Sequence, residues 1–314
     1  MSLTSRVATN RQPVKGWLIA AGLGAGLLCH PTAGTAQSVR TVPAARSFQL
    51  GAMRVSVLHD GRLAIPNDGS VFATRAQTAE IGRLLSRAGQ PKDRIALDID
   101  VLLVRTKACV ALIDAGYGTM GKSVLPESLR LAHVSPLEIT DILITHAHPD
   151  HVGGLVDGAG KPAFPRATIH MSAREWRFMQ HQADTRAIAA AVRSRVRTFK
   201  PGTWVVPGIR SRPLSGHTPG HVMYELVSRG ERLLDIGDAA HSSVISLARP
   251  GWTVAWDSDQ GLGASRRVYA LGQLAESHER MFAGHFPFPG VGYVARKGNG
   301  FAFVPNVAPA APKR

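Results

Sequence analysis

Cysteine is scarce in this chain of 314 residues, which contains only Cys29 and Cys109. Cys29 lies in an N-terminal segment that we expect to be removed, so no disulfide can form within the mature chain. Cys109 stands in the apolar run ACVALI, where a buried and unreactive thiol is expected rather than a nucleophile. The reactive groups must therefore be sought among other residue types.

Long apolar runs are scarce as well, and GWLIAAGLGAGLLC at residues 16–29 stands out. This run is too short to span a bilayer comfortably, and it follows a basic start and precedes small residues. We therefore predict a signal peptide at residues 1–36, cleaved before Gln37, and one mature domain at residues 37–314 in the periplasm or outside the cell. A short N-terminal membrane anchor is the alternative, and no further membrane span is expected.

Acidic residues are few, because 22 Asp and Glu oppose 37 Lys and Arg, a net charge of +15. Removal of residues 1–36, which hold three basic residues and no acidic one, leaves +12. The one dense basic run, at residues 193–200, lies within helical spacing at residues 184–199, which predicts a helix with a solvated basic face. Nucleic acid is therefore not an expected partner.

Alternating strand-like and helix-like patterns predict an α/β domain. Residues 53–65 alternate around Asp60-Gly61, which predicts a hairpin turn at that pair. Ser135 and Glu138 form a capping-box pattern just before the apolar strand DILIT at residues 141–145. The second half repeats this mixture of strand pairs and helices. Together the patterns predict two sheets packed as a sandwich and flanked by helices.

The segment ITHAHPDHVGG at residues 144–154 is the most informative about function. It places His146, His148, Asp150 and His151 within six residues, which packing alone hardly explains. Imidazole and carboxylate are groups that zinc-like metals prefer, and α/β folds place their chemistry at the carboxyl ends of strands. The segment therefore predicts metal ligands.

Three further loops each offer one ligand at the end of a strand. They supply His217 in LSGHTPGH, Asp238 in LLDIGDAAH and His285 in MFAGHFPFPG. Any one of them alone would be an ordinary polar loop residue. In combination with the first segment, they favour a site for two metal ions.

The motifs THAHPDHVGG, GHTPGH, IGDAAH and AGHFPF resemble, in this order, the metal motifs of the metallo-β-lactamase superfamily. The stretch AGHFPFPGVGYVARKGNGFAFVP is similar to the methyl parathion hydrolase branch, which also contains dihydrocoumarin-type lactonases. The resemblance implies a four-layer αβ/βα sandwich of two mixed sheets flanked by helices, a dinuclear site between the sheets, and a homodimer. It divides the ligands into a first set, a second set and a bridge: His146, His148 and His217; Asp150, His151 and His285; and Asp238.

This ligand set implies a hydrolase with two divalent ions, zinc in first place, although manganese, cobalt or iron suit the same ligands. Two ions that share a water lower its pKa from about 16 toward neutrality, and Asp150 would orient the resulting hydroxide and take up its proton. We expect attack on aryl esters or lactones, with organophosphate triesters as a further class. The expected partner is thus a small-molecule ester, lactone or phosphotriester.

Other interpretations remain open. A glyoxalase II-like thioester hydrolase shares much of the ligand pattern, and a metal-binding envelope protein without turnover would share all of it. Typical metallo-β-lactamases carry cysteine or serine where this chain has Asp238, which disfavours β-lactam hydrolysis. Acyl-homoserine lactonases carry a tyrosine three residues after the bridging aspartate, where this chain has His241, which disfavours that particular activity.

An apolar pocket with aromatic walls is expected around the metals. Trp176, Phe286 and Phe288 are the candidates, because Trp176 lies on an expected helix and the two phenylalanines follow a ligand histidine. Core packing is an equal alternative for Trp176. His241 and Asp114 lie near the expected site and are candidates for positioning ligands, with stabilisation of a turn as an equal alternative for Asp114.

Overall fold

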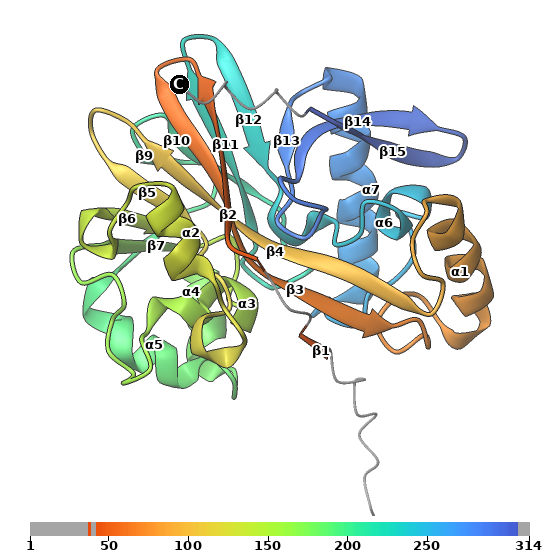
Figure 1. The fold of residues 1–314 in the computed structure, drawn as a ribbon, viewed down its shortest axis with the longest axis horizontal. Helices are drawn as coiled ribbons and strands as arrows, with labels where there is room; N and C mark the ends of the chain where they lie inside the picture. Colours follow the sequence, from red (N-terminus) through yellow and green to blue (C-terminus); the bar gives the residue numbers. More distant parts are fainter. Residues whose placement is uncertain (1–36, 39–41, 307–314) are drawn as a thin grey trace, which may run out of the picture. The chain divides into compact units, whose positions relative to one another are not determined.

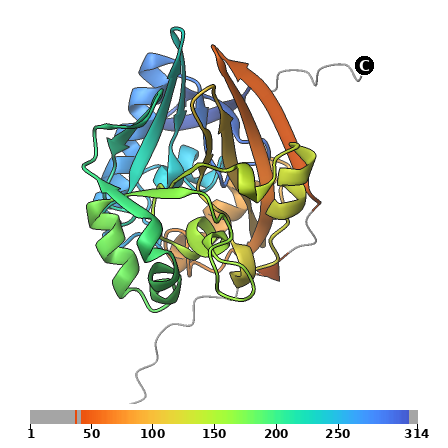
Figure 2. The ribbon, with the colours of Figure 1, turned by 90° about the vertical axis from the view of Figure 1, so that its left-hand side faces the viewer.

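The computed structural model describes residues 37–38 and 42–306. The predicted signal peptide at residues 1–36, and with it the alternative of a membrane anchor, lies outside these residues. Within the described part of the chain, no helix is both long enough and apolar enough to cross a membrane. Two β-sheets lie face to face in this part of the chain (Figure 1; Figure 2).

The first sheet has eight strands in the order β1-β3-β4-β5-β6-β7-β8, with β2 paired to β3. It is mixed, because β3, β4 and β5 pair antiparallel whereas β5 to β8 pair parallel. Its strands are β1 (Gln37–Ser38), β2 (Ala44–Leu50), β3 (Met53–Pro66), β4 (Arg94–Arg105), β5 (Val110–Ile113), β6 (Asp141–Leu143), β7 (Thr168–Ser172) and β8 (Val196–Phe199).

The second sheet has seven strands in the order β15-β14-β13-β12-β11-β10-β9. It is also mixed, since β12 and β13 are parallel and the other pairs are antiparallel. Its strands are β9 (Trp204–Val206), β10 (Ile209–Pro213), β11 (Val222–Ser228), β12 (Glu231–Asp235), β13 (Met281–Phe282), β14 (Val291–Lys297) and β15 (Gly300–Pro305).

Helices cover the outer face of each sheet (Figure 1). The helices α2, α4 and α5 pack on the first sheet, α6 and α7 pack on the second, and α1 packs against the ends of β3 and β4. The helices are α1 (Thr78–Arg87), α2 (Leu125–Leu131), α3 (Pro149–Val152), α4 (Ala173–His181), α5 (Arg186–Val192), α6 (Ile245–Ala248) and α7 (Gln260–Ser277). The predicted two-sheet sandwich flanked by helices is confirmed.

Strand β4 shows why the central strands are apolar without alternation. Val101 and Leu103 face the helices on the outer side, whereas Leu102 and Val104 face the second sheet. All four side chains are at most 1% exposed. A strand buried on both faces needs apolar residues at every position, and the run VLLV supplies them.

The hairpin predicted at Asp60-Gly61 is wrong. β3 continues through this pair, and only its register against β4 shifts there. The Asp60 carboxylate is buried, where it accepts hydrogen bonds from the N–H groups of Tyr117 (2.6 Å) and Leu125 (2.9 Å) and from the hydroxyl of Ser123. The pair therefore forms a bulge that anchors two loops, and an Asp-Gly pair suits a bulge as well as a turn.

The single helix predicted at residues 184–199 is also wrong in its second half. Helix α5 ends at Val192, one 3-10 turn follows at Arg193–Arg195, and residues 196–199 form β8 at the edge of the first sheet. The parallel pairing of β8 with β7 outweighs the helical spacing of the charges. Arg197 accordingly lies in an edge strand, where charge discourages pairing with another chain.

Candidate metal centre

The segment after β6 forms a turn held by Asp114. Both carboxylate oxygens of Asp114 accept hydrogen bonds from Thr145, one from its N–H (2.8 Å) and one from its hydroxyl (2.7 Å). Pro149 begins α3, with a φ that suits the first helical position, so Asp150 and His151 fall in the first turn. The turn thus presents two histidines before the helix and an Asp-His pair within it.

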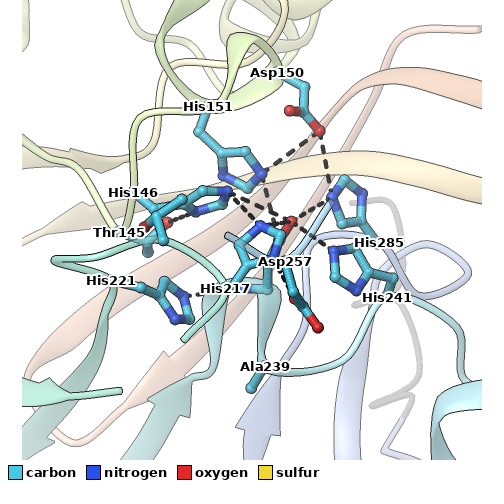
Figure 3. Close-up of polar contacts among 12 residues, drawn as sticks. Thr145, His146, Asp150, His151, His217, His221, Ala239, His241, Asp257 and His285 are labelled. Carbon is cyan, nitrogen blue, oxygen red and sulfur yellow. Dashed lines mark hydrogen bonds and ion pairs between the residues drawn. The ribbon is translucent and has the colours of Figure 1, made fainter. Parts of the chain in front are cut away.

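Loops of the second sheet bring the remaining donors to this turn. His217 lies between β10 and β11, Asp238 lies in a 3-10 turn after β12, and His285 follows β13 (Figure 3). Two groups of ligand atoms result, each with its atoms within 4.8 Å of one another: His146, His148, His217 and Asp238; and Asp150, His151 and His285. The structure brings together all seven side chains named from the sequence.

Asp238 contacts members of both groups. Its Oδ2 lies 3.3 Å from Nε2 of His217 and 3.2 Å from Nε2 of His285, and its Oδ1 lies 3.4 Å from Nε2 of His151. A carboxylate in this position can bind one ion on each side. The geometry therefore suits the bridging role expected for Asp238.

Hydrogen bonds at Nδ1 fix which ring nitrogen of these histidines faces the centre. Three of the rings donate through Nδ1 to an oxygen acceptor: His217 to the Asp257 carboxylate (2.8 Å), His151 to the Asp114 carboxylate (2.7 Å) and His285 to the Asp98 carbonyl (2.7 Å). The Thr145 hydroxyl donates to Asp114, so it accepts from Nδ1 of His146 at 3.0 Å. When these four rings are neutral, the lone pair is thus on Nε2, the atom that faces the centre.

In this neutral form, the Nε2 lone pairs face one another across the centre. The Nε2 atoms of His146 and His217 lie 3.2 Å apart, and within the described residues Nε2 of His151 and Oδ1 of Asp238 are buried without a hydrogen-bond partner. Buried acceptors that converge in this way are unfavourable unless a cation lies between them. The side chains therefore fit two divalent cations bound by imidazole and carboxylate.

Two more histidines hold Asp238 in place. His221 bonds through Nδ1 to the carbonyl of Leu214 and accepts through Nε2 from the N–H of Asp238 (3.2 Å). His241 is fully buried, with Nε2 3.2 Å from Oδ2 of Asp238 and its ring stacked on His285. His241 and Asp114 thus both contact metal-ligand candidates, as expected from the sequence.

Burial keeps several of these rings neutral. It lowers the pKa of His148 to about 3 and that of His241 to about 4. Both imidazoles therefore carry no charge near pH 7. A neutral imidazole is the form that binds metal, so His148 can bind an ion without the loss of a proton.

A family model supports this architecture. The model of the metallo-beta-lactamase superfamily matches residues 94–285, more than half of the chain. The chain belongs to the metallo-β-lactamase superfamily. The matched range includes all seven donors, so the predicted family is confirmed together with its fold.

Known members of the superfamily include lactonases and other hydrolases. AidC, a dizinc quorum-quenching lactonase solved with the product N-hexanoyl-L-homoserine, superposes with a TM-score of 0.81 and 29% identity over 85% of this chain and 98% of AidC. The hydrolase AbOPH superposes with a TM-score of 0.77 and 26% identity over 86% of this chain and 99% of AbOPH. YobT of Bacillus subtilis (strain 168), an uncharacterized protein, is 29% identical over 151 residues, which are 45% of this chain and 61% of YobT.

In this metallo-β-lactamase superfamily member, a cavity of about 390 Å³ opens onto the metal centre. Four apolar side chains and three polar ones line the cavity beside the donors: Leu63, Ile65, Val71 and Trp256; and Tyr117, Gln182 and Asp184. His148, Asp150, Asp238 and His285 face the same cavity. No lysine or arginine is among its described lining residues.

The predicted aromatic walls need correction. Phe286 is 0% exposed and packs edge-on against Phe303 in the core between the second sheet and α7. It therefore does not line the cavity that His285 faces. Trp176 packs against the core of the first sheet, and Phe288 lies edge-on to His59, so neither lines the cavity. The aromatic side chains that line the cavity are Trp256 and Tyr117 instead.

Phe286 should therefore affect stability and not substrate binding. We expect Phe286→Ala to lower the free energy of unfolding by about 3–5 kcal/mol, because it removes a fully buried ring from a close-packed core. Trp256→Ala is the matched comparison and should raise KM for aryl substrates with a smaller loss of stability. Urea denaturation and steady-state kinetics measure both effects. If Phe286→Ala raised KM and left stability unchanged, Phe286 would be a substrate-contacting residue after all.

Two buried carboxylates were not identified from the sequence. Asp257 accepts the hydrogen bond from His217, and Glu175 accepts from the N–H of Ala147 (2.7 Å), the N–H of Gly220 (2.8 Å) and the hydroxyl of Thr218. Glu175 thus joins the two loops that supply the first group of histidines. Its signal in the sequence is weak: a charged residue four positions before the buried Met179 of α4.

Proposed function

We propose that this chain hydrolyses neutral lactones and esters with the help of two divalent metal ions. The observation that carries the proposal is the cavity, which joins the donor cluster to apolar side chains and contains no cationic side chain among its described lining residues. The similarity to AidC, which is a dizinc lactonase, supports zinc and a lactone substrate.

The side chains divide the work of such a reaction. Divalent ions at this site would activate a water at neutral pH and polarise the scissile carbonyl. Asp150 lines the cavity with its carboxylate 3.3 Å from Nε2 of His285, where it can orient the attacking water and accept its proton. Trp256 and Leu63 offer apolar contact to the acyl or aryl part of the substrate.

Charge at the cavity separates this proposal from the alternatives. Glutathione thioesters and β-lactam antibiotics carry carboxylates, which the lining cannot pair and which Asp184 at the rim would repel. Organophosphate triesters are neutral and fit the same argument as a secondary class. Homoserine lactones are neutral too. The similarity to AidC makes them candidate substrates, although this chain has His241 where acyl-homoserine lactonases carry a tyrosine.

A matched pair of esters tests the proposal. p-Nitrophenyl butyrate and p-nitrophenyl hemisuccinate share a leaving group and nearly the same acyl length, but only the hemisuccinate is anionic. We expect kcat/KM to be at least about tenfold higher for the butyrate, because a like charge beside Asp184 and Asp150 is unfavourable. Dihydrocoumarin and N-hexanoyl-homoserine lactone should be cleaved well, methyl paraoxon more slowly, and nitrocefin and S-lactoylglutathione poorly.

Asp184→Lys provides the control for this panel. It should raise kcat/KM for the hemisuccinate by up to about fivefold, the effect of an exposed ion pair worth about 1 kcal/mol, and leave the butyrate nearly unchanged. Faster cleavage of S-lactoylglutathione or nitrocefin than of every neutral substrate would refute the proposal. Two bound metals without turnover of any substrate would favour the binding-protein alternative.

A further inference from the structure

Arg267 on α7 is a buried cation beside the metal centre. Its side chain is 2% exposed, although α7 presents Arg266 and Tyr269 to solvent. The guanidinium makes four hydrogen bonds: from Nε to the carbonyl of Ala239 (3.0 Å), from one terminal nitrogen to the carbonyls of Trp252 (2.7 Å) and Pro250 (3.2 Å), and from the other to the carboxylate of Asp257 (3.0 Å). A buried charge is costly unless it is paired in this way.

The contact with Asp257 links Arg267 to a metal-ligand candidate. One carboxylate oxygen of Asp257 binds Arg267, and the other accepts the hydrogen bond from Nδ1 of His217 (2.8 Å). The three side chains thus form a chain that ends at Nε2 of His217, the atom that faces His146 and Asp238.

The contact with Ala239 links Arg267 to a second metal-ligand candidate, Asp238. Ala239 directly follows Asp238 in the 3-10 turn after β12. One guanidinium therefore fixes both the ring of His217 and the turn that carries Asp238, and these two donors belong to the same group of ligand atoms.

Two glycines allow α7, the His217 loop and Asp257 to lie close together. A Cβ at Gly263, one turn before Arg267 on α7, would lie 2.5 Å from the Asp257 carboxylate. A Cβ at Gly216, which has a φ of +141°, would lie 2.9 Å from the backbone nitrogen of Gly263. The helix, the His217 loop and Asp257 can therefore meet only because both positions lack a side chain.

We propose that Arg267 is a positioning residue of the metal centre, which orients His217 through Asp257 and the Asp238 turn through Ala239 and thereby strengthens binding of the first metal ion. The inference rests on the metal-binding role proposed above. It concerns metal affinity, which is measured without any substrate, so its failure and the failure of the proposed hydrolase activity can be told apart.

Zinc titration of the metal-free protein, in competition with a chelator of known affinity, tests the inference. Arg267→Met keeps the length of the side chain and removes its charge and its donors. We expect it to weaken one of the two zinc affinities about 10–100-fold and to change the other by less than about threefold, the range known for residues that support metal ligands. Asp257→Asn should weaken the same affinity, and the double variant should lose less than the two single losses combined, because both act on His217.

Two controls separate positioning from a general loss of stability. Leu271→Ala removes a fully buried side chain one turn further along α7, and Arg266→Met removes an exposed charge from the same helix. Both should retain the two zinc affinities, whatever urea denaturation shows for their stability. If Arg267→Met does not fold, Arg267→Lys carries the test, since it keeps the charge but not the four hydrogen bonds. Unchanged zinc affinities in a folded Arg267 variant, or an equal loss at both sites that Leu271→Ala reproduces, would overturn the inference.

Discussion

Replacement of Asp150 with asparagine is expected to lower kcat about 10²–10⁴-fold, the usual contribution of a positioned general base. The amide keeps the shape of the side chain and one oxygen for a metal, but it cannot accept a proton from the attacking water. Burial alone would raise the pKa of Asp150, but His151 and His285 beside it lower the pKa well below its usual range, so the carboxylate is ionised at neutral pH.

Metal content and kcat must be measured on the same preparation of the Asp150 variant. The first-site ion should remain, because His146, His148 and His217 are intact. Asp141→Asn is the matched control, since this carboxylate bonds to His170 and does not line the cavity. Wild-type turnover in a fully metal-loaded Asp150→Asn variant would show that another group accepts the proton.

Replacement of His217 with alanine should reduce the metal content from about two ions per chain to one and lower kcat/KM about 10³-fold or more. One metal ion typically stabilises the charge of the transition state by several kcal/mol, and each factor of ten in rate corresponds to about 1.4 kcal/mol. His217 contacts Asp238 and faces His146, so its loss removes a donor from the first group and leaves Asp150, His151 and His285 in place.

Inductively coupled plasma mass spectrometry and kinetics with p-nitrophenyl butyrate check this result. His181→Ala is the control, because this exposed histidine bonds only to the carbonyl of Arg177 within the described residues. If His217→Ala retained two ions per chain and full activity, the assignment of the first group would be wrong.

The donors could be predicted from the sequence because each of them follows a local pattern. A strand ends and a histidine or aspartate follows in the next loop at His146, His217, Asp238 and His285, and a glycine directly precedes the last three. The two-sheet sandwich was predictable for a similar reason, since strands and helices differ in their apolar period.

The residues that support the donors leave no such pattern. Asp257 lies 40 residues from His217, and Arg267 meets Asp257, Ala239 and Trp252 only in the folded chain. Asp60-Gly61 looked like a turn because the sequence does not show that loops at Tyr117 and Leu125 bind its carboxylate. Phe286 looked like a pocket wall because closeness in sequence to His285 does not tell which way the neighbouring side chain points.

The donors come from both sheets: His146 to His151 follow β6 of the first sheet, whereas His217, Asp238 and His285 lie on loops of the second. Ions bound between them would cross-link the two halves of the sandwich as well as serve catalysis. Because ligands that bind only the folded state stabilise it, metal loading should join the sheets into one cooperative folding unit. Without metal, the two sheets lack this link, and amide hydrogen exchange should begin at the strand ends that carry the donors.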